Sequence, residues 1–229
     1  MAIQKKKIYQ NKVQYKWIYD TLISKFYDIS LKIGLTPTGE KILRMSVYNA
    51  LLPYVSRGDT ILDLCCGTGT LTILLSKLFY SDCKIIGVDI SQGQIAQARK
   101  KINNNSDNPI FNVMDAKNLV FEDENFNIVI ISAALHEMDK NERLNVLREV
   151  NRVLKANGLF LIFEHHEPSK TLLRIAYNFY LGYLEKILSH SSEMQRNIFM
   201  ELSKTGFKIM NQIPVKKFLS FFQIILSKK

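Results

Sequence analysis

The stretch that decides the fold reads Ile61-Leu62-Asp63-Leu64-Cys65-Cys66-Gly67-Thr68-Gly69-Thr70-Leu71-Thr72. A short apolar run ends in a glycine-rich turn, and a segment with leucines at helical spacing follows it. Gly67 and Gly69 allow the backbone to turn sharply and a ligand to approach it closely. The first amides of the following helix would face the same ligand. The stretch therefore predicts a strand, a tight loop and a helix, with a binding site at the loop.

A second apolar run, Ile85-Ile86-Gly87-Val88, ends at Asp89. A carboxylate at this distance from the loop can accept hydrogen bonds from two ribose hydroxyls. The loop is not a dinucleotide fingerprint, because Thr72 stands where a glycine or alanine is needed. It is not a phosphate loop either, because no Gly-Lys-Ser/Thr follows. The ligand is therefore expected to contain ribose without being a dinucleotide.

The rest of the chain alternates between apolar strands and amphipathic helices. Strands are expected at 60–65, 84–89, 110–114, 126–132 and 158–164, and helices at about 70–80, 91–103 and 139–155. A helix at about 191–204 and two strands at 207–213 and 218–226 follow. Strands that are apolar throughout belong to a parallel sheet covered by helices on both faces. We therefore predict an α/β, Rossmann-like fold with a seven-stranded, mostly parallel sheet.

In such a sheet, right-handed crossovers bring the carboxyl ends of the strands to one edge, and ligands bind outside that edge. Several polar residues and glycines come directly after strands. We expect them to converge there although they are far apart in sequence: Asp63, Gly67, Gly69, Asp89, Asp115, Ser132 and Glu164.

Two segments do not fit the alternation. Residues 1–55 contain two predicted helices, at about 11–33 and from Thr36-Pro37 to about residue 52, and we expect them to form a helical lid over the ligand. Residues 56–229 would form the ligand-binding domain, interrupted at about 169–189 by a helix with a wide apolar face. That helix packs on the core, which we favour, or lines an apolar substrate pocket, or contacts a membrane.

The composition narrows the class of protein. No apolar run approaches the roughly 18 residues of a membrane span, and no secretory signal follows the basic start. The three cysteines lack metal-type spacing, which favours a reducing cytoplasm. The net charge of +10 is spread along the chain. It favours a solvated basic surface over a nucleic-acid site, and leaves open a peripheral contact with a membrane. The oligomeric state is not indicated.

The pattern Asp63-x-x-x-Gly67-Thr68-Gly69, with Asp89 after the next strand, resembles the S-adenosylmethionine site of class I methyltransferases. The resemblance covers nearly the whole chain and implies an antiparallel last strand. Leu62 to Gly69 and Leu147 to Gly158 are similar to the ubiquinone and menaquinone C-methyltransferase subgroup and its small-molecule relatives. This chain differs from that subgroup at 133–137, where the quinone enzymes typically carry an arginine-asparagine pair, and at 164–168.

The resemblance implies a cofactor site. Gly67 and Gly69 would cradle the amino acid end of S-adenosylmethionine, and Asp63 would bind its amino group. The remaining expected contacts are Asp89 with the ribose, Ile90, Asp115 and Ala116 with the adenine, Thr72 and Ser132 with the methionyl part, and Tyr27 closing over the cofactor. Asp115 has the alternative of a solvent-facing loop acid, and Thr72 and Ser132 that of local packing.

Methyl transfer from an activated sulfonium needs positioning and exclusion of water more than a catalytic group. A base is required only when the acceptor must lose a proton. Three of the four histidines fall at the ends of the fourth and fifth predicted strands, which fits such a base. We take His136 with Glu137 as the first catalytic candidate and Glu164 as the second. Of His165 and His166, at most one should face the substrate.

These histidines and the neighbouring acids could also serve as metal ligands. Their spacing along the chain matches no zinc signature, so we expect no metal.

The leading hypothesis is a methyltransferase for a small, apolar or membrane-derived molecule. A phospholipid N-methyltransferase is a second reading, because of the basic charge and the apolar helix. A regulator that binds S-adenosylmethionine without catalysis is a third, since fold and cofactor do not fix function. A nucleic-acid methyltransferase is disfavoured because Ser132-Ala133-Ala134-Leu135 replaces the Asn/Asp-Pro-Pro-aromatic turn of enzymes that methylate base amines.

Overall fold

The computed structural model describes residues 37–79, 81–102, 109–166, 171, 190–215 and 222–229. The predicted helix at 11–33, Tyr27 and, apart from residue 171, the predicted insertion at 169–189 lie outside these residues. Of the predicted lid, the structure describes the helix α3 (Pro37–Leu51) and the residues that follow it. Within the described part of the chain, no helix is both long and apolar enough to cross a membrane.

Seven strands form one sheet in the order β3-β2-β1-β4-β5-β7-β6. Their bounds are β1 Thr60–Leu64, β2 Lys84–Asp89, β3 Ile110–Val113, β4 Phe126–Ser132, β5 Leu154–His165, β6 Lys208–Pro214 and β7 Phe222–Lys228. Strands β1 to β5 pair in parallel, whereas β7 is antiparallel to both β5 and β6. The predicted Rossmann-like fold with an antiparallel last strand is therefore confirmed.

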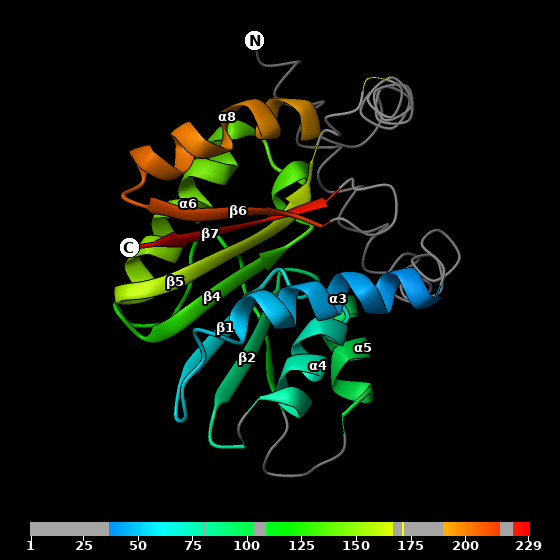
Figure 1. Cartoon of the computed structure of the whole chain (residues 1–229). Coiled ribbons are helices and arrows are strands. Elements are labelled where there is room, and N and C mark those ends of the chain that lie inside the picture. Colours follow the sequence, from blue (N-terminus) through cyan, green and yellow to red (C-terminus); the bar gives the residue numbers. More distant parts are fainter. Residues whose placement is uncertain (1–36, 80, 103–108, 167–170, 172–189, 216–221) are drawn as a thin grey trace, which may run out of the picture.

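Helices cover both faces of the sheet, as the apolar strands indicated. The helices are α4 Thr70–Leu78, α5 Gln92–Lys100, the short 3-10 helix η2 Leu135–Glu137, α6 Lys140–Val153 and α8 Ser191–Lys204, besides α3. Successive residues of β4 point to opposite faces of the sheet: Ile130 packs with α3 and α4, whereas Ile131 packs with α6 and α8. Figure 1 shows α6 and α8 on one side of the sheet and α3, α4 and α5 on the other.

The boundaries of several elements differ from the sequence prediction, most clearly where α6 meets β5. Strand β5 begins at Leu154 instead of residue 158, because Leu154 already pairs with Phe126 of β4. Helix α6 consequently ends at Val153 and leads directly into the strand. Its other end begins where predicted, because Asp139 and Glu142 form a capping box. Between β4 and α6 lies η2, which carries His136 and Glu137 to the carboxyl edge of the sheet.

Candidate functional site

Four acidic residues surround Cys65 at the carboxyl edge of the sheet. Burial raises the pKa of the Cys65 thiol, and the negative charges of Asp89, Glu137, Asp63 and Asp115 raise it further. This edge is therefore acidic, although the chain as a whole carries a net charge of +10. An acidic site suits a ligand that carries both a sulfonium and an ammonium group, so these residues fit S-adenosylmethionine. Of the residues predicted to converge at this edge, Asp63, Asp89 and Asp115 all act on this one thiol.

The glycine-rich loop is fastened to the end of β2 by Asp89. One carboxylate oxygen accepts a hydrogen bond from the Gly67 amide at 2.9 Å, and the other accepts one from the Ser91 amide at 2.8 Å. Residues 65, 67 and 69 have φ of 61°, 55° and 70°. This left-handed conformation is natural for the two glycines and strained for Cys65. Asp89 thus stabilises the conformation of the loop through these two bonds.

Position 69 requires glycine for a second, steric reason, which sequence reasoning missed. A Cβ on Gly69 would lie 2.5 Å from the ring of Phe111 and 2.9 Å from Cβ of Ala98. The same ring would meet a Cβ on Gly87 of β2 at 2.7 Å. Phe111, on β3, therefore fills the space beneath the loop. The only hint in the sequence was a second glycine, at position 87, inside an apolar strand.

Asp63 and Thr72 bind each other in the interior, directly beneath the loop. The Thr72 hydroxyl donates a hydrogen bond of 2.6 Å to Asp63, and both side chains are buried. Burial raises the pKa of Asp63 to about 6, although the bond from Thr72 and the charge of Arg44 oppose this shift. A cationic ligand close to Asp63 would favour the charged carboxylate again.

The other predicted cofactor contacts are spread along the same edge. Ile90 leaves 48% of its surface exposed directly after Asp89, whereas Ala116 is buried in the core. Asp115 accepts a hydrogen bond from the Lys117 amide at 2.9 Å, and Ser132 is half-buried at the end of β4. These positions are compatible with the predicted roles, which remain predictions.

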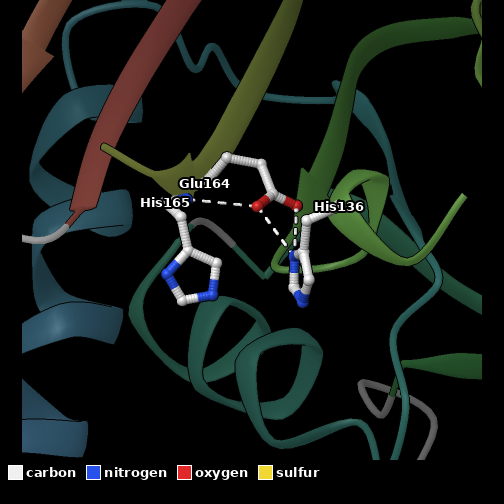
Figure 2. A group of neighbouring side chains, drawn as sticks. All are labelled: His136, Glu164 and His165. Carbon is white, nitrogen blue, oxygen red and sulfur yellow. Dashed lines mark hydrogen bonds and ion pairs between the residues drawn. The ribbon is translucent and has the colours of Figure 1, made fainter. Parts of the chain in front are cut away.

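A second group of side chains gathers at the ends of β4 and β5. His136 from η2 points to Glu164 of β5, and the imidazole of His165 lies beside both (Figure 2). The Nδ1 atom of His136 is 2.9 Å from Oε2 of Glu164 and 3.2 Å from Oε1. The Glu164 carboxylate is fully buried and also accepts bonds from the backbone amides of Leu135, at 2.8 Å, and His165, at 3.1 Å. The structure thus pairs His136, from the first catalytic candidate, with Glu164, the second candidate.

The charges in this group depend on one another. Burial alone would lower the pKa of His136, but the charge and the hydrogen bond of Glu164 outweigh it and raise the pKa to about 9. Burial would raise the pKa of Glu164, but the interaction with His136 lowers it to about 2. Burial lowers the pKa of His165 to about 4, against the attraction of Glu164. The group is therefore an ion pair beside a neutral imidazole, and Glu137 adds its negative charge to the field at His136.

Two further elements hold η2 in place. Arg143 of α6 is fully buried, forms two hydrogen bonds of 2.9 Å with Glu201 of α8, and donates one of 2.7 Å to the Met138 carbonyl that ends η2. The backbone amide of His190 donates to the carbonyl of His136 at 2.6 Å. Sequence reasoning missed this support. The signal was an arginine in the apolar stripe of α6, three residues before Val146.

Comparisons with known proteins show the family and the fold. Residues 61–158 match a family model described as a methyltransferase domain. A demethylmenaquinone methyltransferase from Lactobacillus johnsonii is 30% identical over 181 residues, which cover 76% of this chain and 72% of that protein. An uncharacterized methyltransferase from Synechocystis is 31% identical over 172 residues, covering 75% and 74% of the two chains.

Solved structures show the same fold. A magnesium protoporphyrin IX methyltransferase from Synechocystis superposes with a TM-score of 0.72 at 17% identity, covering 95% of this chain and 99% of that one. A methyltransferase from Methanosarcina mazei gives a TM-score of 0.63 at 21% identity, with 79% and 96% covered. These structures show the fold, and the two relatives at 30% and 31% identity show the family: the chain belongs to the class I S-adenosylmethionine-dependent methyltransferases.

Proposed function

We propose that this methyltransferase acts on a small molecule whose proton is taken up by the His136–Glu164 pair. The observation that carries the proposal is the buried Glu164 carboxylate within hydrogen-bond distance of Nδ1 of His136. In such a pair the carboxylate holds the proton on Nδ1, which leaves the lone pair on Nε2. The two backbone amides on Glu164 fix the carboxylate, so the imidazole is oriented before the acceptor binds.

The pKa of His136, about 9, bears on how the pair would work. An imidazolium cannot accept a proton, so the base must be in its neutral form. S-adenosylmethionine supplies an activated methyl group and a positive charge. A positive charge at the same edge disfavours the imidazolium and lowers the pKa of His136 from about 9. Cofactor binding would therefore increase the share of neutral His136, the form that can take a proton.

A proton acceptor at this place favours one kind of acceptor molecule. A hydroxyl, a protonated amine or an activated carbon must lose a proton when it is methylated, whereas a thioether has a free lone pair and needs no base. The relatives named demethylmenaquinone methyltransferases make a quinol-like acceptor the first candidate. The departures of this chain at 133–137 and 164–168 include His136 and Glu164 themselves, so we do not assign that substrate to it.

The cofactor would be held by the residues that the sequence pattern indicated. We propose the roles given above for Asp63, Gly67, Gly69, Thr72, Asp89, Ile90, Asp115, Ala116 and Ser132, and for Tyr27 outside the described residues. The support is the bonding of Asp89 to the loop, the acidic field around Cys65 and the exposed apolar side chain of Ile90. Nucleic acid is not among the proposed partners.

The test uses radiolabelled S-adenosylmethionine with a cell extract, followed by partition of the label. Label in the organic phase is expected, and the fraction then identifies the acceptor. Label that remains in the aqueous small-molecule phase would exclude an apolar acceptor. The His136→Phe variant should bind the cofactor and lose transfer. Cofactor binding without transfer to any extract would support a regulator instead, and label in phospholipid would support the N-methyltransferase.

A further inference from the structure

The group of His136, Glu164 and His165 has the composition of a metal site. Each residue offers one ligand atom, and the three atoms lie within 4.8 Å of one another. We propose that this group binds a divalent transition-metal ion, with Zn²⁺ as the best match, in place of the proton between His136 and Glu164. Spacing along the chain did not indicate this site, because two of the ligands are 28 residues apart and meet only through the pairing of β4 with β5.

The His136–Glu164 contact already has nearly the right dimensions. Zinc binds histidine nitrogen and carboxylate oxygen at about 2.0–2.2 Å, so two such ligands of a tetrahedral ion are about 3.3 Å apart. The Nδ1 atom of His136 lies 2.9 Å and 3.2 Å from the two oxygens of Glu164. A small rotation of either side chain would therefore admit the ion. A larger rotation is needed only for the ring of His165.

Glu164 is prepared to act as a ligand. A carboxylate has about four positions at which it can accept a bond. The amides of Leu135 and His165 take one position on each oxygen, and the side that remains faces His136. Backbone bonds of this kind orient a ligating carboxylate and are typical of the outer shell of metal sites.

His165 supplies an independent observation. Its Nδ1 atom is buried and has no hydrogen-bond partner among the described residues. A buried polar atom without a partner is costly and needs an explanation. The ring stacks on Phe222, with centroids 4.8 Å apart, and meets the ring of His136 edge-on at 4.7 Å. A rotation of this imidazole about its Cβ–Cγ bond exchanges the sides on which its nitrogen and carbon atoms lie, and a metal bound by the group could then satisfy Nδ1.

The ligand set also selects the kind of metal. Two imidazoles and one carboxylate form the set of catalytic zinc sites that keep a fourth position open for water or a substrate atom. Magnesium and calcium prefer oxygen ligands and would bind weakly here. The consequence for catalysis rests on the proposed function. A metal on Nδ1 leaves the ring proton on Nε2, so His136 can no longer accept a proton, and the metal-bound enzyme should be inhibited.

The test measures binding without turnover, so its result does not depend on the proposed function. The untagged full chain is freed of metal with a chelator and titrated with Zn²⁺ by calorimetry and with Co²⁺ by visible absorption. We expect one site with the absorption of tetrahedral cobalt. Glu164→Gln and His165→Phe should each weaken binding by about tenfold or more. His165→Phe preserves an aromatic ring against Phe222, and His165→Gln serves as a second variant if the first fails to fold.

Two control variants separate this site from other ligands. His190→Gln removes an imidazole whose side chain is 50% exposed and lies outside the group. Cys65→Ser with Cys66→Ser removes the nearby thiols. Both should bind metal as the unmodified chain does. No binding up to millimolar metal, unchanged affinity in His165→Phe, or loss of binding in the cysteine variant would each overturn the proposal.

Discussion

The two ends of the site are built in different ways. At the ends of β1 and β2, the loop is fixed by backbone amides that bind Asp89, within a short stretch of sequence. At the ends of β4 and β5, the His136–Glu164 pair joins side chains 28 residues apart, and Arg143 of α6, paired with Glu201 of α8, binds the end of η2. The first end carries the sequence pattern by which the chain resembles class I methyltransferases, and the second end holds the residues that we propose for proton uptake. We therefore expect mutations at the two ends to affect cofactor binding and methyl transfer independently.

The largest effect is expected from His136→Phe at the second end. Loss of a general base slows a reaction by about 10²–10⁴-fold, whereas the affinity for S-adenosylmethionine should stay the same. Single-turnover transfer to the acceptor fraction, in the presence of a chelator, measures the first quantity, and calorimetry measures the second. If cofactor affinity falls together with the rate, the two ends of the site do not act independently.

The second effect is on stability and concerns the support of η2. Glu201→Ala leaves the Arg143 guanidinium buried without its bidentate partner, which should lower the free energy of unfolding by about 3–5 kcal/mol. Replacing both partners, with Arg143→Met and Glu201→Leu, should recover most of this loss. Urea denaturation measures both. A loss below 1 kcal/mol in Glu201→Ala, on the order of a surface ion pair, would show that α8 does not support the acceptor end.

The third prediction concerns the first end. Asp89→Ala removes the acceptor of the Gly67 and Ser91 amides and the proposed ribose contact. The proposed contact consists of two charge-assisted hydrogen bonds to the ribose hydroxyls. Their loss, at about 1.5 kcal/mol each, corresponds to an affinity for S-adenosylmethionine about 100-fold lower. The control is Asp82→Ala, at an acid in a surface contact of 3.9 Å with Arg57. Equal affinities of the two variants would remove Asp89 from the cofactor site.

The smallest effect is a pH dependence. Burial raises the pKa of Asp63 to about 6, so the carboxyl is protonated in acid. The amino group of the cofactor, with an ordinary pKa near 8, stays cationic there and favours the ionised form. Affinity should therefore fall by up to about tenfold per pH unit below 6 and level off above it. Calorimetry between about pH 5 and 7 tests this; Asp63→Asn should give a flat profile, and a flat profile in the unmodified chain would contradict the assignment.

The same shift affects folding. A folded-state pKa above the ordinary value of 3.8 means that Asp63 favours the folded state at low pH, and that this contribution is lost as the pH rises through about 6. The free energy of unfolding of Asp63→Asn should therefore exceed that of the unmodified chain by most above pH 6.

The difference between the two ends also decides what sequence can reveal. The mostly parallel sheet follows from the apolar runs, and the loop follows from Gly67, Gly69 and Asp89, because these signals are local, whereas the order of the strands was not predicted. His136 and Glu164 could each be placed at a strand end, but their contact required the register of β4 against β5. The burial of Arg143 and the position of Phe111 under Gly69 depend on packing between distant elements. No periodicity encodes such contacts.

The left-handed backbone at Cys65 limits which residues suit that position. Residues 65, 67 and 69 all have positive φ, and only position 65 lacks a glycine. A non-glycine residue there costs about 1–2 kcal/mol, which the packing of the cysteine side chain against the core can offset. Cysteine and glycine codons differ by a single nucleotide. A Cys65→Gly change therefore needs one nucleotide, and it would relieve the backbone strain at the loss of the packing of the cysteine side chain.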